Sequence, residues 1–394
     1  MTDASATDAI LAINAGSSSL KFALYEAESL ALLCRGGVSG LGAAARLEIS
    51  GPLALTGAPP DCDHAGAVAW LLDALRRVPG LAVRAAGHRV VHGGRDFSAP
   101  VRIDDAVLAR LDRLVPLAPA HQPLNLAGLR AVAEVWPGLP QIACFDTAFH
   151  RGQPRLAQLF PIPRALSDEG LLRYGFHGLS YEHIATVLPE VAGPRAEGRV
   201  IVAHLGHGAS LCALRNRRSI ASTMGLTALD GLMMGTRSGS VDPGLVLHLI
   251  GERGLSPGAV ADLLNARSGL LGVSGISDDM RVLQDSDDPR AAEALDLFAY
   301  RAVREAGSLV AALGGLDALV FTAGIGENAP RMRATIASNL AAFGVALDPA
   351  RNAGGERCIS RAGSRVAVYV VPANEELPIA RAVVHCFAEA TSRG

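Results

Sequence analysis

Residues Ile10–Leu24 read Ile-Leu-Ala-Ile-Asn-Ala-Gly-Ser-Ser-Ser-Leu-Lys-Phe-Ala-Leu, and they guide the interpretation of the whole chain. An apolar run, Ile10–Ile13, ends in the polar turn 14–19, and a second apolar run, Leu20–Leu24, leaves that turn. Two short apolar runs joined through a Gly/Ser turn predict a β-hairpin. The turn offers backbone N–H groups, an amide and hydroxyls, with Lys21 close behind, and this set of donors suits a phosphate group. The alternative is an ordinary solvated hairpin turn.

Lysine usage favours the phosphate interpretation. Lys21 is the only lysine among the 36 basic residues, and all the others are arginines. A compact ammonium and a planar guanidinium are not interchangeable where a point charge must sit against phosphate. We therefore interpret Lys21 as a functional cation.

Length and composition indicate a packed globular protein. The 394 residues suit two domains, possibly three, and 49% of them are hydrophobic while 19% are charged. The formal net charge of −2 argues against a nucleic-acid or membrane-surface partner. The polar N-terminus does not resemble a signal peptide, and no apolar run is long enough to span a bilayer. The six scattered cysteines, without a Cys-x-x-Cys pair, indicate reduced thiols and a cytoplasmic location.

The spacing of apolar residues and the positions of glycine and proline predict the first helices and strands of the chain. Helices are expected at 67–77 and 104–114, and after the polar loop 118–125. A strand is expected to run into the glycines of 87–94, whereas 36–66 shows only a Gly/Ala-rich composition. A buried strand is expected at 141–145, and Asp146 follows its C-terminal end. A last strand is expected at 366–371, and it leads into Asn374-Glu375-Glu376. A C-terminal helix from Leu377 is expected to pack on the first domain.

The opening pattern recurs later in the chain. Residues Val200–Leu214, shifted by 190 positions (200 minus 10), align with Ile10–Leu24 without a gap. Three pairs are identical: Gly16 with Gly206, Ala23 with Ala213 and Leu24 with Leu214. A further buried strand, 318–322, runs into a glycine turn, 323–328, with a helix start near Pro330, which suits an anion site. The turn has neither the dinucleotide fingerprint nor the P-loop motif.

Glycine turns therefore follow apolar strands at 14–19, 204–210 and 322–328. This pattern predicts an α/β protein with the duplicated, ribonuclease H-like, two-domain fold of actin, Hsp70 and the sugar kinases, with an interdomain cleft. The expected domains are 1–147 with the C-terminal helix at about 378–394, carrying the first phosphate-side hairpin, and 148–377, carrying nucleotide-binding loops.

At the level of motifs the chain resembles the acetate kinase family from about Ile10 to Arg381. The motifs that carry the resemblance are Asn14-Ala-Gly-Ser-Ser-Ser-Leu-Lys21, Gly87-His-Arg-Val-Val-His-Gly-Gly94, Asp146-Thr-Ala-Phe-His150, Tyr174-Gly-Phe-His-Gly178, Met234-Gly-Thr-Arg237, Gly324-Ile-Gly-Glu-Asn328 and Asn374-Glu-Glu376. The resemblance implies direct in-line transfer of the ATP γ-phosphoryl group to acetate, reversibly, giving acetyl phosphate and ADP. It also implies Mg²⁺ (or Mn²⁺), ATP as co-substrate and a homodimer.

The resemblance also implies roles for individual residues. The catalytic residues would be Asp146, Arg89, Arg237 and His177, and transition-state support would come from His121, His177 and Arg237. The phosphate and nucleotide residues would be Lys21, Ser17, Ser19, His204, Gly206, His207, Gly208, Asp279, Met280, Arg281, Gly324, Ile325, Gly326, Glu327 and Asn328. The acid would contact Arg89, Val91, Ala120, Phe176 and Ala228, and the metal Asn14 and Glu375. We expect His92, His150 and His183 to be structural, and Glu376 to be exposed beside the ligand Glu375.

Carboxylate chemistry makes sense of these residue types. A carboxylate acceptor is ionised at neutral pH, because free carboxyl pKa values lie near about 4. It needs no general base, so we assign Asp146 to orienting an arginine, metal or water. The barrier is instead repulsion between an anion and a polyphosphate, which two arginines, a metal ion and imidazole donors reduce.

The chain departs from the family pattern at four positions. Ala120 replaces a usual Leu and Ala228 a usual Pro, which predicts a larger acid pocket. Such a pocket discriminates by only about 1–3 kcal/mol per methylene, so propionate or butyrate is an alternative acceptor. His207 replaces a usual Asn, and Met280 stands where an aromatic often lies near adenine, which leaves pyrophosphate open as an alternative donor. A non-enzymatic nucleotide-binding clamp would not need the set Arg89, Asp146, Arg237 and Glu375.

Overall fold

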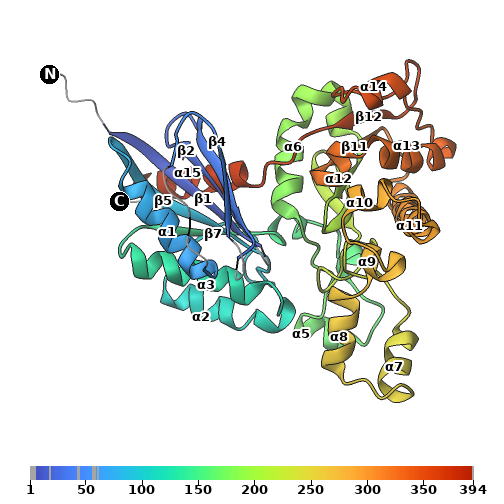
Figure 1. The fold of residues 1–394 in the computed structure, drawn as a ribbon, viewed down its shortest axis with the longest axis horizontal. Coiled ribbons are helices and arrows are strands. Elements are labelled where there is room, and N and C mark those ends of the chain that lie inside the picture. The colour runs from blue at the N-terminus through green and yellow to red at the C-terminus, as the bar shows by residue number, and fades with distance from the viewer. Residues whose placement is uncertain (1–5, 17–18, 42–44, 56–58, 60–61, 393–394) are drawn as a thin grey trace. The chain divides into compact units, whose positions relative to one another are not determined.

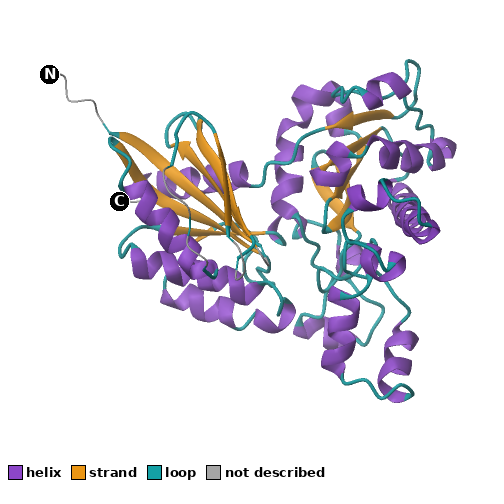
Figure 2. Ribbon diagram, in the orientation of Figure 1, coloured by secondary structure: helices purple, strands orange, loops and turns teal. Residues whose placement is uncertain are grey.

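A computed structural model describes residues 6–16, 19–41, 45–55, 59 and 62–392. The chain divides into two compact units (Figure 1). Unit 1 comprises Met1–Ala148 and Asn374–Gly394, and unit 2 comprises Phe149–Ala373. Each unit is built on its own β-sheet (Figure 2).

The sheet of unit 1 has the strand order β4-β3-β2-β1-β5-β7-β6. Its strands are β1 (Thr7–Ala15), β2 (Ser19–Glu26), β3 (Leu32–Ser39), β4 (Arg46–Ser50), β5 (Leu81–Val90), β6 (Val101–Arg102) and β7 (Gln141–Phe145). Strands β1 and β2 pair antiparallel, which confirms the predicted hairpin, and β1, β5 and β7 run parallel. Strand β4 and most of β3 fall in the segment for which the sequence indicated only a Gly/Ala-rich composition.

Helices cover both faces of this sheet. They are α1 (His64–Arg76), α2 (Asp105–Asp112), the 3₁₀ turn η1 (Val115–Leu117), α3 (Gln122–Val135) and α15 (Glu376–Ser392). Helices α1 and α3 pack on the face that carries Leu11, Ile13 and Ala86. Successive residues of a strand point to opposite faces, so Gly87 faces the other way, and there it meets Ile379 of α15. The C-terminal helix is thus part of the core of unit 1.

The sheet of unit 2 has the order β10-β9-β8-β11-β12. Its strands are β8 (Arg199–Leu205), β9 (Ala209–Arg215), β10 (Arg218–Ser222), β11 (Ala318–Thr322) and β12 (Ala367–Val370). Strands β10, β9 and β8 are antiparallel neighbours, and β8, β11 and β12 run parallel. The same arrangement relates β3, β2, β1, β5 and β7 in unit 1. The predicted duplication is therefore confirmed at the level of strand order and direction.

The remaining helical segments belong to unit 2 or to its boundary. They are η2 (Ala148–His150), α4 (Arg155–Gln158), α5 (Arg164–Glu169), α6 (Gly178–Ala192), η3 (Gly193–Glu197), α7 (Pro243–Gly251), α8 (Pro257–Ala266), α9 (Gly269–Ser274), α10 (Met280–Gln284), α11 (Pro289–Leu313), α12 (Ala323–Asn328), α13 (Pro330–Asn339), η4 (Ala341–Phe343) and α14 (Pro349–Ala353).

The expectation of a glycine turn at 323–328 was wrong. These residues form the short helix α12, and α13 follows it after one residue. Ala323 begins α12 with φ of +67°, so the chain leaves β11 through a left-handed backbone conformation. The helix start expected near Pro330 is confirmed, because α13 begins at that residue.

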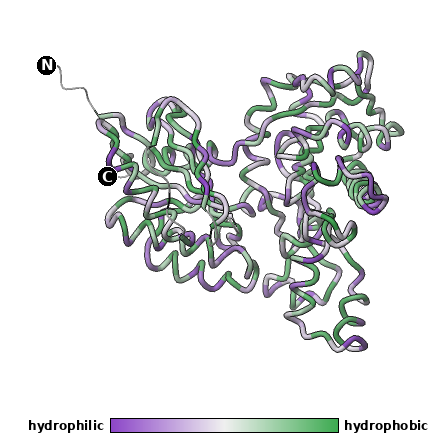
Figure 3. Tube along the Cα trace, viewed as in Figure 1, coloured by the Kyte–Doolittle hydropathy of each residue, from purple (hydrophilic) through white to green (hydrophobic). Residues whose placement is uncertain are grey.

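Helix α7 carries an unusual surface. It is rich in Leu, Val and Ile (Figure 3). None of its residues is buried, and Leu247 is 70% exposed. Within the described part of the chain, no helix combines the length and the apolar character needed to cross a membrane.

Candidate active site

Four polar side chains meet at one edge of the unit 1 sheet. Arg89 donates from Nε to both carboxylate oxygens of Asp146, at 3.0 Å each, and from a terminal nitrogen to Oδ2 at 2.5 Å. Another Arg89 nitrogen donates to Asn14 Oδ1 at 3.1 Å, and Asn14 Nδ2 donates to Glu375 Oε2 at 2.9 Å. We call Asn14, Arg89, Asp146 and Glu375 the unit 1 cluster.

Sheet topology explains why these residues meet. Asn14 lies near the end of β1, Arg89 near the end of β5, and Asp146 directly follows β7. These three strands run parallel, and the carboxyl ends of parallel strands form one edge, where α/β proteins bind ligands. The fourth member, Glu375, directly precedes α15, which packs on the same strands.

Charge pairing dominates the electrostatics of the cluster. The Asp146 side chain is only 1% exposed. Burial alone would lower the pKa of Arg89, but the charges of Asp146 and Glu375 outweigh burial and hold this pKa above its ordinary value. Arg89 therefore stays a cation, and its orientation is fixed by both oxygens of Asp146.

The unit 1 cluster offers some, but not all, of the oxygen ligands that a hard divalent cation needs. Mg²⁺ is commonly held by one or two carboxylates together with substrate phosphates, and the Glu375 carboxylate lies beside the Asn14 amide. No group of three His, Cys, Asp or Glu side chains that could hold a metal occurs among the described residues. The donor set fits a cation that takes most of its ligands from substrate and water.

Two side chains that the sequence reading missed hold the first turn. His64 Nε2 donates to the Gly16 carbonyl at 2.6 Å, and Asn125 Nδ2 donates to the Ala15 carbonyl at 3.0 Å. Both residues are distant in sequence from the turn, so no local pattern in the sequence predicts these contacts. Lys21 is exposed on β2, paired in register with Asn14. Ser19 begins β2 and is partly buried, and Ser17 lies outside the described residues.

Glu376 corrects a prediction. The sequence suggested an exposed neighbour of Glu375, but Glu376 is 8% exposed. Burial and the charge of Glu375 raise the pKa of Glu376. Glu375, by contrast, is partly accessible, with 17% of its side chain exposed, and so is the better placed of the two to meet a ligand.

In unit 2, a chain of hydrogen bonds fixes His177. This residue precedes α6 with φ of +57°, a strained conformation for a residue other than glycine. Its Nδ1 shares a hydrogen bond of 2.8 Å with Ser210 Oγ, which Tyr181 also contacts. The His177 ring stacks on His204 with centroids 4.1 Å apart, and His204 Nδ1 bonds Ser180 Oγ. Neither Ser180, Tyr181 nor Ser210 was singled out from the sequence.

Gly208 brings His177 and Arg237 to the same turn. A β-carbon at Gly208 would lie 2.7 Å from a terminal nitrogen of Arg237 and 3.2 Å from His177 Nε2. The turn between β8 and β9 therefore packs directly against both side chains, and a side chain at position 208 would displace the end of Arg237. Arg237 also donates to the Ala228 carbonyl at 2.7 Å. His177 and Arg237, which the sequence analysis grouped as catalytic, are thus close together.

Most of the expected nucleotide residues line one pocket of about 410 Å³ in unit 2. Its lining residues are Gly206, His207, Asp278, Asp279, Met280, Arg281, Gln284, Gly324, Ile325, Asn328 and Ala329. Asp278, Gln284 and Ala329 were not expected. His207 Nε2 lies 2.9 Å from Asp278 Oδ2. A hydrogen bond from Arg281 lowers the pKa of Asp279, which caps α10.

Gly326 and Glu327, expected among the nucleotide residues, do not line this pocket. The Gly326 carbonyl accepts a hydrogen bond from Arg333, and Glu327 Oε1 accepts one from the Ala373 backbone N–H at 2.9 Å. Both residues fix the backbone of α12. The motif 324–328 therefore contains both residues that line the pocket and residues that support them. Successive residues of a helix point in different directions, so they do not all face the pocket.

The expected acid-pocket and support residues divide between the units. Val91 is buried in unit 1, whereas Ala120 is exposed and His121 partly exposed just before α3. Phe176 is buried in unit 2, and Ala228 is partly buried there. Among the histidines expected to be structural, His92 and His150 are fully buried.

Comparison with known proteins identifies the family. The model of the acetokinase family matches residues 9–381. The chain belongs to the acetokinase family.

Relatives within the acetokinase family span almost the full chain. An acetate kinase of Nitrobacter hamburgensis is 54% identical over 387 residues, covering 95% of this chain and 95% of the relative. The crystal structure of an acetate kinase from Porphyromonas gingivalis is 36% identical and covers 96% of this chain and 100% of its own, with a TM-score of 0.85. That of a propionate kinase from Francisella tularensis is 36% identical and covers 95% and 98%, with a TM-score of 0.89. The fold class expected from the sequence is thereby confirmed.

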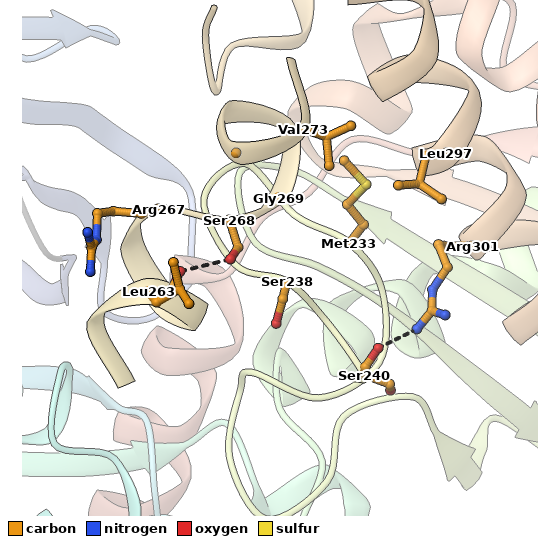
Figure 4. A pocket seen from close by; sticks show the side chains of 11 residues that line it. Met233, Ser238, Ser240, Leu263, Arg267, Ser268, Gly269, Val273, Leu297 and Arg301 are labelled. Carbon is orange, nitrogen blue, oxygen red and sulfur yellow. Dashed lines mark hydrogen bonds between the residues drawn. The ribbon is translucent and has the colours of Figure 1, made fainter. Parts of the chain in front are cut away.

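This acetokinase-family chain has a second cavity in unit 2, of about 470 Å³ (Figure 4). Met233, Val273 and Leu297 form its apolar side, and Arg301 donates to the Ser240 carbonyl at 2.7 Å. None of the site residues expected from the sequence lines it.

Proposed function

We propose that the protein transfers the γ-phosphoryl group of ATP reversibly to acetate, giving acetyl phosphate and ADP. Membership of the acetokinase family supports the reaction class, and the 54% identical Nitrobacter hamburgensis acetate kinase supports acetate as acceptor. The observation that carries the proposal is the guanidinium of Arg89, held by both oxygens of Asp146 next to Asn14 and Glu375. A binding protein that does no phosphoryl transfer has no need of this arrangement.

In unit 1, Arg89 would act as an oriented cation. An acetate oxygen attacks the γ-phosphorus in line, the bond from that phosphorus to the β–γ bridging oxygen breaks, and its electron pair leaves with ADP. No proton has to be removed from acetate. The role of Asp146 is therefore to orient Arg89, because both of its oxygens already accept hydrogen bonds from that side chain.

In unit 2, His177 and Arg237 would stabilise the transferring phosphoryl group. Ser210 occupies His177 Nδ1, which leaves Nε2 directed toward Gly208 and Arg237. Donors fixed before the reaction stabilise developing charge without reorganisation, which is the largest catalytic effect in many enzymes. His121 and His204 are proposed as supporting residues.

We propose Mg²⁺, or Mn²⁺ in its place, as the metal, held by Glu375 and Asn14 with the nucleotide phosphates. The ion would neutralise phosphate charge when bound. Asn14 Nδ2 donates to Glu375 in the structure, so the two residues that would hold the ion already lie side by side. Lys21, Ser17 and Ser19 are proposed to face the phosphates from the first turn.

The pocket of unit 2 supports a nucleotide donor. Met280 and Ile325 give it apolar surface, and Gln284 and Asn328 add amide groups, which suits a nucleoside better than pyrophosphate. We accordingly propose that unit 1 acts as the phosphate-side domain and unit 2 as the nucleotide domain. Propionate or butyrate stays an alternative acceptor because of Ala120 and Ala228.

We also propose a cytoplasmic homodimer. The exposed apolar residues of α7, among them Leu245, Leu247 and Ile250, support a contact with a second copy, because such a patch is costly to leave in water. The scattered cysteines suit a reducing compartment.

A hydroxamate assay tests the proposed function. Purified protein is given acetate, propionate or butyrate, crossed with ATP, GTP or pyrophosphate, in the presence of Mg²⁺. We expect the highest kcat/KM with acetate and ATP. A kcat/KM for acetate about threefold or more above those for both larger acids would exclude the enlarged-pocket alternative. Absence of acyl hydroxamate with every pair would overturn the kinase assignment.

A further inference from the structure

Within the part of the chain that the structure describes, Arg333 is a buried arginine without an acidic partner. It lies on α13, is only 1% exposed, and is the largest fully buried side chain among the described residues. Its Nε donates to Asn352 Oδ1 at 2.8 Å, and a terminal nitrogen donates to the Asn352 carbonyl at 2.8 Å. Its other terminal nitrogen donates to the carbonyls of Gly326 and Glu327, at 2.9 and 2.7 Å. All its partners are neutral oxygens, and burial lowers the pKa of its guanidinium.

A buried arginine of this kind reduces the stability of the fold compared with an apolar residue. A buried cation loses its hydration, and without a carboxylate only hydrogen bonds offset that loss. An apolar side chain of similar length would fill the same space at lower cost. The position of the guanidinium, between the last carbonyls of α12 and residue Asn352 of α14, therefore points to a role in holding α12.

Helix α12 needs support because its start is strained. Ala323 has φ of +67°, a strained backbone conformation that a residue other than glycine keeps only where the surrounding structure imposes it. The helix has only six residues, so its own hydrogen bonds hold it weakly. Beyond Arg333, the side chain of Glu327 ties its end to the Ala373 backbone.

The same short helix forms one wall of the nucleotide pocket. Gly324, Ile325 and Asn328 line the pocket, while the intervening Gly326 and Glu327 present their carbonyls to Arg333. A shift of those carbonyls displaces the lining residues with them, because all five belong to one helix.

We propose that Arg333 is a positioning residue for the nucleotide: it fixes α12 from behind, so that Gly324 and Ile325 keep the position that binds ATP. The proposal rests on the proposed function, because it takes the pocket as the donor site. Arg333 does not touch the nucleotide and acts through α12.

The test compares Arg333→Met with wild type. Methionine keeps an unbranched apolar side chain and removes the charge and all four hydrogen bonds. We expect the KM for ATP to rise about 10-fold to 100-fold, the range typical when support for site residues is lost. The KM for acetate should be unchanged. Hydrogen–deuterium exchange should be faster in the peptide covering 323–329 of the variant, without any ligand.

Ile336→Ala provides the matched control. Ile336 lies on the same helix and is 3% exposed, so its truncation destabilises α13 while leaving the four Arg333 bonds in place. This control should leave the KM for ATP unchanged. Equal KM changes in Arg333→Met and Ile336→Ala would mean that Arg333 is only structural, and would overturn the proposal.

Two further measurements keep the test decisive. If Arg333→Met does not fold, Asn352→Ala, which removes the acceptor of Nε, should raise the KM for ATP by a smaller factor, and an unchanged KM would overturn the proposal. If wild type makes no acyl hydroxamate, the proposed function fails, but titration calorimetry with ATP and the exchange comparison still decide the role of Arg333.

Discussion

At the scale of single residues, the unit 1 cluster shows how one charge pair defines a candidate site. Arg89 and Asp146 are 57 positions apart, and hydrogen bonds from two guanidinium nitrogens reach both carboxylate oxygens. The orientation of the Arg89 guanidinium is therefore fixed before any ligand binds. Preorganisation of this kind is what phosphoryl transfer to an anion demands.

Loss of either proposed catalytic arginine should reduce turnover strongly. We expect Arg89→Ala and Arg237→Ala each to lower kcat by roughly 10²–10⁴, because each removes a preorganised donor. Steady-state hydroxamate kinetics measure the effect. Arg84→Ala is the matched control, since Arg84 lies on the same strand as Arg89 and makes an exposed ion pair with Asp8. Near-normal turnover of Arg237→Ala would contradict its assigned role.

At the scale of elements, the contact between β5 and α15 is tight enough to test. A β-carbon at Gly87 would lie 2.4 Å from Ile379 Cγ2 and 2.7 Å from Val383 Cγ2. Helix α15 therefore lies directly on the backbone of β5. The segment that precedes α15 carries Glu375, so the seating of this helix also sets the unit 1 cluster.

Substitution of Gly87 should consequently weaken both stability and the site. We expect Gly87→Ala to reduce the free energy of unfolding by about 1–3 kcal/mol, the usual cost of overpacking, and to lower activity. Urea unfolding measures the first effect. Gly128→Ala is the control, and we expect it to raise the free energy of unfolding. A β-carbon added at Gly128 would meet no atom outside its own helix within 4 Å, and alanine in α3 should stabilise the protein by about 0.5–1 kcal/mol. Wild-type stability of Gly87→Ala would show that the contact relaxes freely.

The segment 323–328 shows where element prediction failed. Two glycines after a buried strand favour a turn, because glycine weakens helices. The observed α12 exists because Arg333 and Glu327 provide tertiary hydrogen bonds that local propensity does not contain.

At the scale of the whole molecule, one buried histidine in each unit makes stability depend on pH. Burial lowers the pKa of His88 in unit 1 to about 3 and that of His150 in unit 2 to about 4. In the unfolded chain both would titrate near about 6.5. Between those values the unfolded state binds protons that the folded state does not, so stability is fully present above about pH 6.5 and is lost as the pH falls.

We therefore expect the free energy of unfolding to decrease below about pH 6.5, by up to about 1.4 kcal/mol per pH unit for each of the two histidines. Urea unfolding at a series of pH values checks this. His150→Gln should flatten the dependence in the range between pH 4 and 6.5. A slope for His150→Gln equal to that of wild type would contradict the assignment.

The sequence by itself determined the opening hairpin, the fully buried strands and the duplication, but not β4 or most of β3. Apolar runs such as 141–145 and 318–322 are strands with the expected bounds, because a fully buried strand is visible in its own composition. The motifs also determined the family, since they occur together along most of the chain.

Only the tertiary structure decided which side chains meet. Asn14 and Glu375 are 361 positions apart and share a hydrogen bond, because α15 returns to pack on β1 and β5. Glu376 is buried for the same reason: its surroundings, which include Lys21 and Arg35, come from strands distant in sequence. Local patterns record the burial and the period of one segment, whereas partners across a sheet or between helices are fixed by how those segments pack together.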